Sequence, residues 1–218
     1  MGRRLRGSKK LIHVFCEGES EQAYTEFLRK TFRDVAVIKQ PRSPGLFEEA
    51  SSRFEKDKHY RDEAEIIDEI WFFFDVEKKD VDKWYGRKTI INTLRRLRGN
   101  AKIRVRLFMT TGCLEYWLML HYKLFAPPLT TVAEKNRMLE EIRKQEPHYE
   151  KGNQDITAKI AAHYGTAVSH AETRMMQLLQ EGLPGLDDTD ERNQWLVQTC
   201  PTFSTVHEAI RFLETLKR

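Results

Sequence analysis

The feature that most constrains the fold is an alternation of short apolar segments with longer amphipathic ones over residues 11–122. The short segments are rich in residues that favour β-strands, and the longer ones carry apolar side chains at helical spacing. This order predicts βαβ units, and therefore an α/β fold with a mostly parallel four-stranded sheet flanked by helices. The predicted strands cover residues 11–16, 34–41, 70–77 and 102–109.

Helices are predicted between and after these strands. Ser20 is the expected N-cap of the first helix, and Gly99 is the expected C-terminal cap of the helix before the last strand. The predicted helical ranges are 20–32, 46–65, 84–97, 113–122, 131–145, 154–181 and 204–217. No strand is expected after the "APPL" break, so we divide the chain into an α/β core (1–126) and a helical extension (127–218) that packs on it as one structural unit.

Composition places the chain among soluble globular proteins. Of its 218 residues, 40% are hydrophobic and 32% are charged, and no apolar run is long enough to span a membrane. The apolar run 11–16 is also too short for a secretory signal. The three cysteines, Cys16, Cys113 and Cys200, are odd in number and widely spaced, which favours a reducing compartment. We therefore expect a cytoplasmic protein.

The formal net charge is only +4, but the basic residues are clustered in the sequence. Basic blocks lie at residues 2–10 and 95–106, and such blocks suit a phosphate-backbone partner. Arg104 and Arg106 alternate along a predicted strand, so they point to one side and are candidate nucleic-acid-binding residues. Pairing with the abundant glutamates, on a solvated surface, is the alternative.

Carboxylates follow two predicted strands where each strand ends. Glu17 follows the first, with Glu21 one helical turn later, and Asp75 and Glu77 close the third. The carboxyl ends of parallel strands share one edge of the sheet, so these acids converge if the two strands are neighbours. Grouped carboxylates repel unless a cation lies among them, and oxygen ligands suit Mg²⁺ or Mn²⁺. The pattern therefore favours phosphoryl or phosphodiester chemistry.

Other titratable residues have two interpretations each. Glu19 and Asp80 are the kind of strand-end acid that often serves only as a cap or a surface turn. Glu115 lies in an apolar helix, where an acid is costly unless it is paired or bound, so it is either a ligand or half of a salt bridge. His121 is more easily explained as a hydrogen-bonded packing residue than as a catalytic one.

Two of these segments resemble the Toprim domain. "CEGESEQAY" at residues 16–24, together with an apolar strand that ends in "DVE" at residues 75–77, is similar to the glutamate and the D-x-D motif of that family. Toprim domains occur in primases, topoisomerases and several nucleases. The resemblance implies an α/β fold that uses Mg²⁺.

Nearly the whole chain resembles the RloB-like family, which is encoded beside restriction-modification and phage-defence genes. The matching segments are "EGESE" at residues 17–21, "GCLEYWLMLHY" at residues 112–122 and, more weakly, "CPTFSTVHEAIRFLETL" at residues 200–216. Two departures stand out. Glu77 replaces the second aspartate of D-x-D, which bears on metal preference, and Thr-Gly-Cys replaces Ser-Asn-Pro in the middle segment, which bears on the local turn.

The resemblance assigns roles to five residues. Glu17 is the expected metal ligand or general acid/base, and Asp75 and Glu77 are expected metal ligands. Glu21 is a supporting acid at the metal, and Glu115 is a supporting catalytic acid. It implies a nuclease that cleaves DNA or RNA, tRNA included, with Mg²⁺ or Mn²⁺. It also implies antiphage defence and an AAA-type ATPase partner encoded nearby. No membrane partner is expected, and a homo-oligomer is left open.

Two alternatives remain at this point. One is a non-catalytic Toprim-like module that binds nucleic acid or the partner ATPase. The other is a different Mg²⁺-dependent phosphoryl enzyme, such as a phosphatase or a nucleotide hydrolase. The chain has no Walker loop, which disfavours an independent NTPase. A primase or topoisomerase is disfavoured because no template-binding or catalytic-tyrosine domain is evident.

Overall fold

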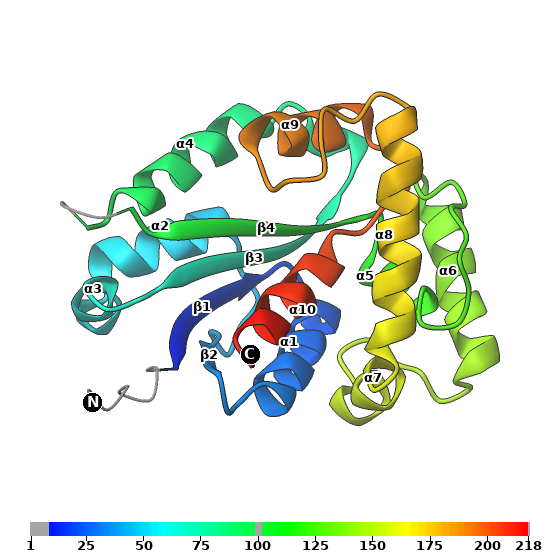
Figure 1. The fold of residues 1–218 in the computed structure, drawn as a ribbon, viewed down its shortest axis with the longest axis horizontal. Helices are drawn as coiled ribbons and strands as arrows, with labels where there is room; N and C mark the ends of the chain where they lie inside the picture. Colours follow the sequence, from blue (N-terminus) through cyan, green and yellow to red (C-terminus); the bar gives the residue numbers. More distant parts are fainter. Residues whose placement is uncertain (1–8, 99–101, 218) are drawn as a thin grey trace, which may run out of the picture.

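A four-stranded parallel sheet forms the centre of the computed structural model, which describes residues 9–98 and 102–217 (Figure 1). The strand order is β2-β1-β3-β4, and every neighbouring pair is parallel. The strands are β1 (Lys10–Cys16), β2 (Ala36–Lys39), β3 (Glu69–Val76) and β4 (Arg104–Thr111). The predicted α/β class is therefore confirmed, and the sheet is fully parallel.

Strands β1 and β3 are direct neighbours, which the convergence of the acids requires. Cys16 is paired with Phe73, so the two strands end at the same edge of the sheet. Side chains of β3 alternate between the two faces: Trp71 and Phe73 join one buried cluster, and Phe72 joins the other. Both faces are covered by helices, which is why β3 is a continuous apolar run.

Most of the predicted helices are present, with three differences. The helix predicted over 46–65 is two helices, because Asp57 ends the first and caps the second. The helix predicted over 154–181 is also two. A helix at Asp190–Thr199 was not expected. The helices are α1 (Glu19–Thr31), α2 (Phe47–Lys56), α3 (Lys58–Ala64), α4 (Trp84–Arg95), α5 (Leu114–Met119), α6 (Val132–Gln145), α7 (Gln154–Ala161), α8 (Tyr164–Gln180), α9 (Asp190–Thr199) and α10 (Val206–Thr215), with a 3₁₀ turn, η1 (Lys78–Asp80).

Neither of the two helix caps predicted from the sequence is found in the described structure. Helix α1 begins at Glu19 with Gly18 as its N-cap, so the prediction of Ser20 as the cap is wrong. The hydroxyl of Ser20 is instead used in a tertiary hydrogen bond to Glu115. The cap predicted at Gly99 lies outside the described residues.

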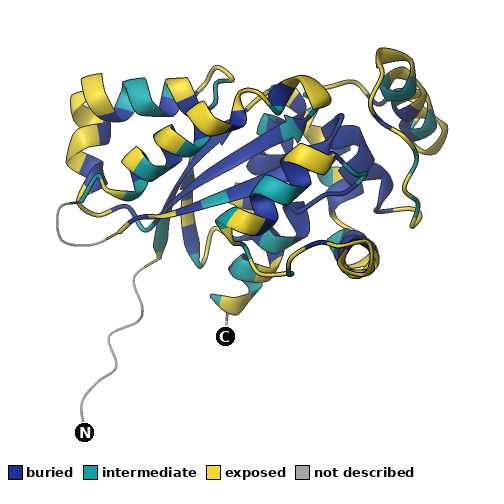
Figure 2. Cartoon of the chain, turned by 90° about the horizontal axis from the view of Figure 1, so that it is seen from above, coloured by how far each residue is buried: buried dark blue, intermediate teal, exposed yellow. Residues whose placement is uncertain are grey.

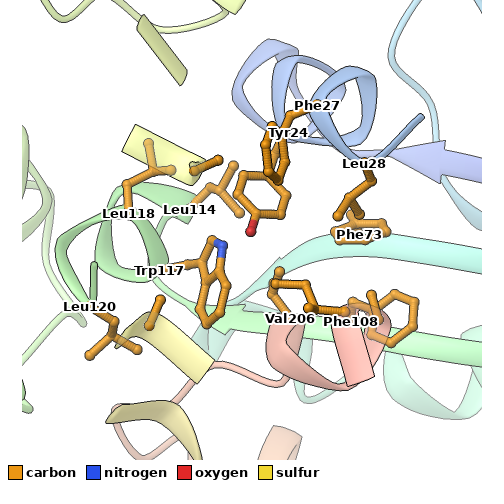
Figure 3. Packing of buried hydrophobic residues seen from close by; sticks show 14 of the residues in the cluster. Tyr24, Phe27, Leu28, Phe73, Phe108, Leu114, Trp117, Leu118, Leu120 and Val206 are labelled. Atoms are coloured by element: carbon orange, nitrogen blue, oxygen red, sulfur yellow. The ribbon is translucent and has the colours of Figure 1, made fainter. Parts of the chain in front are cut away.

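Two buried clusters fill the space on either side of the sheet, and Figure 2 shows the buried sheet between helices with exposed outer faces. The first cluster brings together side chains of α1, α5, α7, α8 and α10. Figure 3 shows part of it, where the ring of Trp117 meets the ring of Tyr24 edge-on at a centroid distance of 5.9 Å. The second cluster lies under α2, α3, α4 and α9.

The C-terminal segment closes one edge of the sheet. Ser204 forms an isolated antiparallel bridge with Thr110 on β4, and Thr205 donates its amide to the Met109 carbonyl at 2.8 Å. Helix α10 then packs on β4, so residues far apart in the chain share one core. The division at residue 126 stays a prediction. Within the described ranges, no helix is long and apolar enough to cross a membrane.

Candidate functional site

A small acidic pocket lies at the carboxyl ends of β1 and β3, on the face of the sheet covered by α1 and α5. Its volume is about 170 Å³. Four carboxylates that the sequence predicted as site residues line it from three segments of the chain, together with one lysine from a fourth segment. The lining residues are Glu17, Gly18, Glu19, Ser20, Glu21, Asp75, Glu115 and Lys151. We call this cavity the acidic pocket.

Glu17 and Asp75 join the two strand ends directly. The Asp75 backbone N–H donates to Oε2 of Glu17 at 2.9 Å, and the Glu17 N–H donates to the Phe73 carbonyl at 3.0 Å. Glu17 is exposed at the rim. Desolvation of its carboxylate nevertheless raises the pKa of Glu17, and the hydrogen bond from Asp75 offsets this only in part.

Glu21 lies in the first turn of α1 and is 4% exposed. Its position depends on Gly18, because a Cβ at residue 18 would lie 3.0 Å from Oε2 of Glu21. Burial raises the pKa of Glu21 to about 7, and the charges of Glu115 and Glu17 add to this effect. A carboxyl group with a pKa near 7 can hold or release a proton at neutral pH.

Asp75 is placed by the alternation of β3, which turns it to the same face as Trp71 and Phe73. Its Oδ1 atom is buried and has no hydrogen-bond partner among the described residues. Burial raises the pKa of Asp75 well above its usual value, and the charges of Glu21 and Glu17 raise it further. A buried acceptor without a donor is costly, and a cation would satisfy it.

Glu115, in the first turn of α5, is 1% exposed and has the richest set of partners in the acidic pocket. Its Oε1 accepts hydrogen bonds from the Ser20 hydroxyl at 3.0 Å and from the Tyr149 hydroxyl at 2.9 Å. Its Oε2 lies 3.3 Å from Nζ of Lys151. These contacts fix the Glu115 carboxylate and supply the pairing that a buried acid needs.

Glu77 is not brought into the acidic pocket. Strand β3 ends at Val76, and the Glu77 carboxylate is paired with Lys79 and with Lys135 of α6. Those lysines lower the pKa of Glu77 against the opposing effect of its burial. Asp80 is also placed elsewhere, within 3.0 Å of Arg87.

The two candidate phosphate-binding arginines lie at the opposite end of β4. Arg106 makes a forked pair with Glu69, at 2.7 and 3.0 Å, and Arg104 lies 3.2 Å from Asp188. Both side chains line a separate cavity of about 870 Å³, so they do not face the acidic pocket. Of the basic block at residues 2–10, all but the last two residues lie outside the described part of the chain.

His121 has the surroundings of a packing residue. It is 6% exposed, its Nδ1 lies 3.1 Å from the Trp117 and Leu118 carbonyls, and burial lowers its pKa to about 4. Its ring meets the rings of Trp117 and Tyr24 rather than the acidic pocket.

Tyr149 and Lys151 were not predicted from the sequence. They follow α6 in a loop that comes close to the start of α1, where a Cβ at Gly152 would lie 2.9 Å from Cβ of Glu19. Gly152 has a φ of +76°, which favours glycine. The only local signal was "KGN" at residues 151–153, a turn signature that indicates a loop and not a site.

The donor set of the acidic pocket suits a hard divalent cation, since five carboxylates line it and one of their oxygens, Oδ1 of Asp75, has no hydrogen-bond partner among the described residues. The side chains are not arranged as a ready-made site: within residues 9–98 and 102–217, no group of three or more His, Cys, Asp or Glu residues has the geometry to hold a metal ion. The chemistry of the residues therefore fits a cation, although their side chains are not arranged around a single point.

A comparison with protein families agrees with the segments quoted above. The family described as RloB-like protein matches residues 12–213, which is nearly the whole chain and includes every residue of the acidic pocket. No curated protein and no solved structure matches the chain significantly. On the strength of the family match, this chain belongs to the RloB-like protein family.

Proposed function

We propose that this chain is a divalent-metal-dependent nuclease of the Toprim type, which cleaves phosphodiester bonds in DNA or RNA. The observation that carries the proposal is the acidic pocket, where Glu17, Glu21, Asp75 and Glu115 meet at the edge where parallel sheets bind ligands. Here Oδ1 of Asp75 is buried without a partner among the described residues.

The exposure of each residue in the acidic pocket suggests a different role for it. Glu17 is exposed and is the candidate general base or ligand, whereas the half-buried Asp75 and the buried Glu21 are the candidate ligands for Mg²⁺ or Mn²⁺. When bound, such an ion polarises a phosphate and lowers the pKa of an attacking water. Lys151 brings positive charge to the pocket, where it suits a phosphate oxygen. Glu115 holds that lysine in place.

The test is divalent-ion binding by calorimetry, with Mg²⁺ and Mn²⁺, on the wild type and on Asp75→Asn and Glu17→Gln. We expect each substitution to weaken binding by about tenfold or more, since each removes a charged ligand. Asp34→Asn and Glu65→Gln are matched controls on exposed surface and should bind as the wild type does. The same set is then assayed for metal-dependent cleavage of single-stranded and duplex DNA, of RNA, and of tRNA.

Two results would contradict the proposal. The first is no ion binding at millimolar concentration, either alone or with a phosphodiester oligonucleotide added to complete the site. The second is ion binding that survives both Asp75→Asn and Glu17→Gln. Nucleic-acid binding that needs no divalent ion, without any cleavage, would instead support a non-catalytic binding module.

The resemblance to phage-defence proteins also suggests a cellular role. We propose that the nuclease acts in antiphage defence in the cytoplasm and is controlled by an AAA-type ATPase. Family membership supports this role, and reconstitution with the neighbouring ATPase would test it.

A further inference from the structure

A second cavity lies along the edge strand β2, outside the acidic pocket. Its volume is about 840 Å³, within the range of small-ligand sites. Residues of α1, α3, β2 and the segment after β2 line it, so it wraps around the edge of the sheet. Its lining includes Gln22, Arg42, His59, Tyr60 and Gln154, together with charged side chains of α1 and β2. We call this cavity the β2 groove.

The β2 groove adjoins the acidic pocket through two shared segments. Glu21 lines the acidic pocket, and the next residue of α1, Gln22, lines the β2 groove. Near the start of α7, Lys151 lines the acidic pocket and Gln154 lines the β2 groove. The segment after β2 is held against α1, because the Gln22 amide donates to the Pro41 carbonyl at 3.1 Å. A chain of nucleotides leaving the acidic pocket along this side would therefore enter the β2 groove.

Charge in the β2 groove is largely compensated, with one exception. Arg29 makes a forked pair with Glu26, at 2.7 Å to each oxygen, and Lys39 is paired with Glu63. Arg42 is exposed, and within the described part of the chain it makes no ion pair. A single uncommitted guanidinium suits one phosphate better than a broad backbone surface.

The remaining lining suits a nucleobase. Gln154 is exposed, and its amide, which makes no hydrogen bond with the described residues, offers both a donor and an acceptor. The ring of His59 is 66% exposed and stands edge-on against Tyr60 at a centroid distance of 6.2 Å. Exposed rings of this kind stack on unpaired bases, and amides read base edges.

We propose that the β2 groove binds an unpaired nucleotide adjoining the scissile phosphate, so that the substrate is a single-stranded stretch of nucleic acid. This inference rests on the proposed function, because it takes the acidic pocket as the cleavage site. A base inside a duplex is stacked and paired, and its edges and faces could reach the groove only after it is unpaired.

The test is binding of labelled oligonucleotides by fluorescence anisotropy, on the Asp75→Asn background and with EDTA present, so that neither cleavage nor metal binding affects the result. Arg42→Ala should weaken single-strand binding by about tenfold and reduce the slope of log affinity against log salt by about 0.7, the value for one phosphate contact on a single strand. His59→Ala and Gln154→Ala should weaken binding by about fivefold each, and His59→Ala should leave the salt slope unchanged because stacking does not involve counterion release.

The controls are Arg137→Ala and Gln180→Ala, which remove an exposed arginine and an exposed glutamine that do not line the groove. Both should bind as the background does. Unchanged affinity and salt slope in Arg42→Ala and Gln154→Ala would overturn the proposal, and so would a duplex that binds as tightly as a single strand of equal length. Matched RNA and DNA strands identify the sugar, and either preference supports the proposal. If the groove variants behave as expected but the wild type never cleaves with Mg²⁺ or Mn²⁺, the nuclease proposal fails and strand binding remains.

Discussion

At the scale of single residues, Gly18 leaves room for the carboxylate of Glu21 in the acidic pocket because it has no side chain. Its backbone is extended, with a φ of −141°, so alanine can adopt this conformation without strain. The added Cβ would nevertheless lie 3.0 Å from Oε2 of Glu21, so that carboxylate would have to shift by a few tenths of an ångström. Glycine is therefore favoured at position 18 because a side chain would crowd Glu21, and not because the backbone conformation requires glycine.

Gly18→Ala should affect divalent-ion binding much more than the stability of the fold. We expect the free energy of unfolding to change by less than about 1 kcal/mol, because the native backbone suits alanine. We expect divalent-ion affinity to fall by about tenfold to a hundredfold, as when a metal ligand loses its support. Urea unfolding and calorimetry measure the two quantities.

Gly86→Ala is the matched control for this substitution. It lies in α4 with no atom within 4 Å of the added Cβ, so it should raise stability by about 1 kcal/mol and leave ion binding unchanged. Equal ion affinities for Gly18→Ala and Gly86→Ala would show that the position of Glu21 does not matter for binding.

The residues of the acidic pocket were predictable to the extent that strand periodicity places them. Glu17 and Asp75 follow from two rules, that parallel strands end at one edge and that side chains alternate along a strand. Glu77 obeys the same alternation but follows the last residue of β3, and the lysines beside it hold it elsewhere. Lys151 could not be predicted, since only tertiary packing decides which loop lies over a strand end.

At the scale of elements, the edge of β4 depends on one threonine. The hydroxyl of Thr205 accepts a hydrogen bond from the Met109 backbone N–H at 2.8 Å and donates to the Leu107 carbonyl at 3.2 Å. Thr205 is fully buried. It thereby satisfies edge groups that would otherwise lie in the core without partners.

Thr205→Val keeps the shape of this side chain and removes its hydroxyl. We expect a loss of about 2 kcal/mol in the free energy of unfolding, because a buried N–H and a buried carbonyl lose their partner. Thr173→Val removes an exposed hydroxyl that bonds only to a carbonyl four residues earlier in α8, so it should change stability by less than about 0.5 kcal/mol. Similar midpoints in urea for the two variants would contradict this account of the edge.

The elements themselves were predicted where periodicity was strong and missed where it was weak. All four strands were found, because each is a short apolar run bounded by polar residues. Helix α9 was missed because its apolar residues, Trp195 to Val197, are adjacent rather than spaced at helical intervals. Its only clear signal was the cap, in which the Thr189 hydroxyl accepts from the Arg192 N–H, with Asp190 and Glu191 in the first turn.

At the scale of the whole molecule, three buried histidines link stability to pH. Burial lowers the pKa of His13, His121 and His207 to about 4 each. Between pH 4 and 6.5 the unfolded chain therefore binds more protons at these sites than the folded one. Their contribution is fully present above pH 6.5 and is lost as the pH falls towards 4. Glu21, with its pKa raised to about 7, acts in the opposite direction above pH 4.5, so variants must be compared with one another.

His121→Phe should remove one proton from this linkage. We expect the slope of the unfolding free energy against pH, near pH 5, to fall by about 1.4 kcal/mol per pH unit relative to the wild type. His148→Phe replaces an exposed histidine and should leave the slope unchanged. The measurement is urea unfolding at a series of pH values. A slope that is the same in both variants would mean that His121 is already protonated in the folded protein.

The acidic pocket is assembled from segments that lie far apart in the chain, at residues 17–21, 75, 115 and 149–151. A ribosome that adds about 5–20 residues per second needs on the order of ten seconds to pass from Glu17 to Lys151. The edge of β4 is closed later still, by residues 203–205. If the chain is the nuclease proposed above, this order delays the assembly of its active site among the nucleic acids of the cell. A chain that has not been synthesised past residue 115 lacks one of the four acids, so we expect the acidic pocket to form only after Glu115 and Lys151 have both been added.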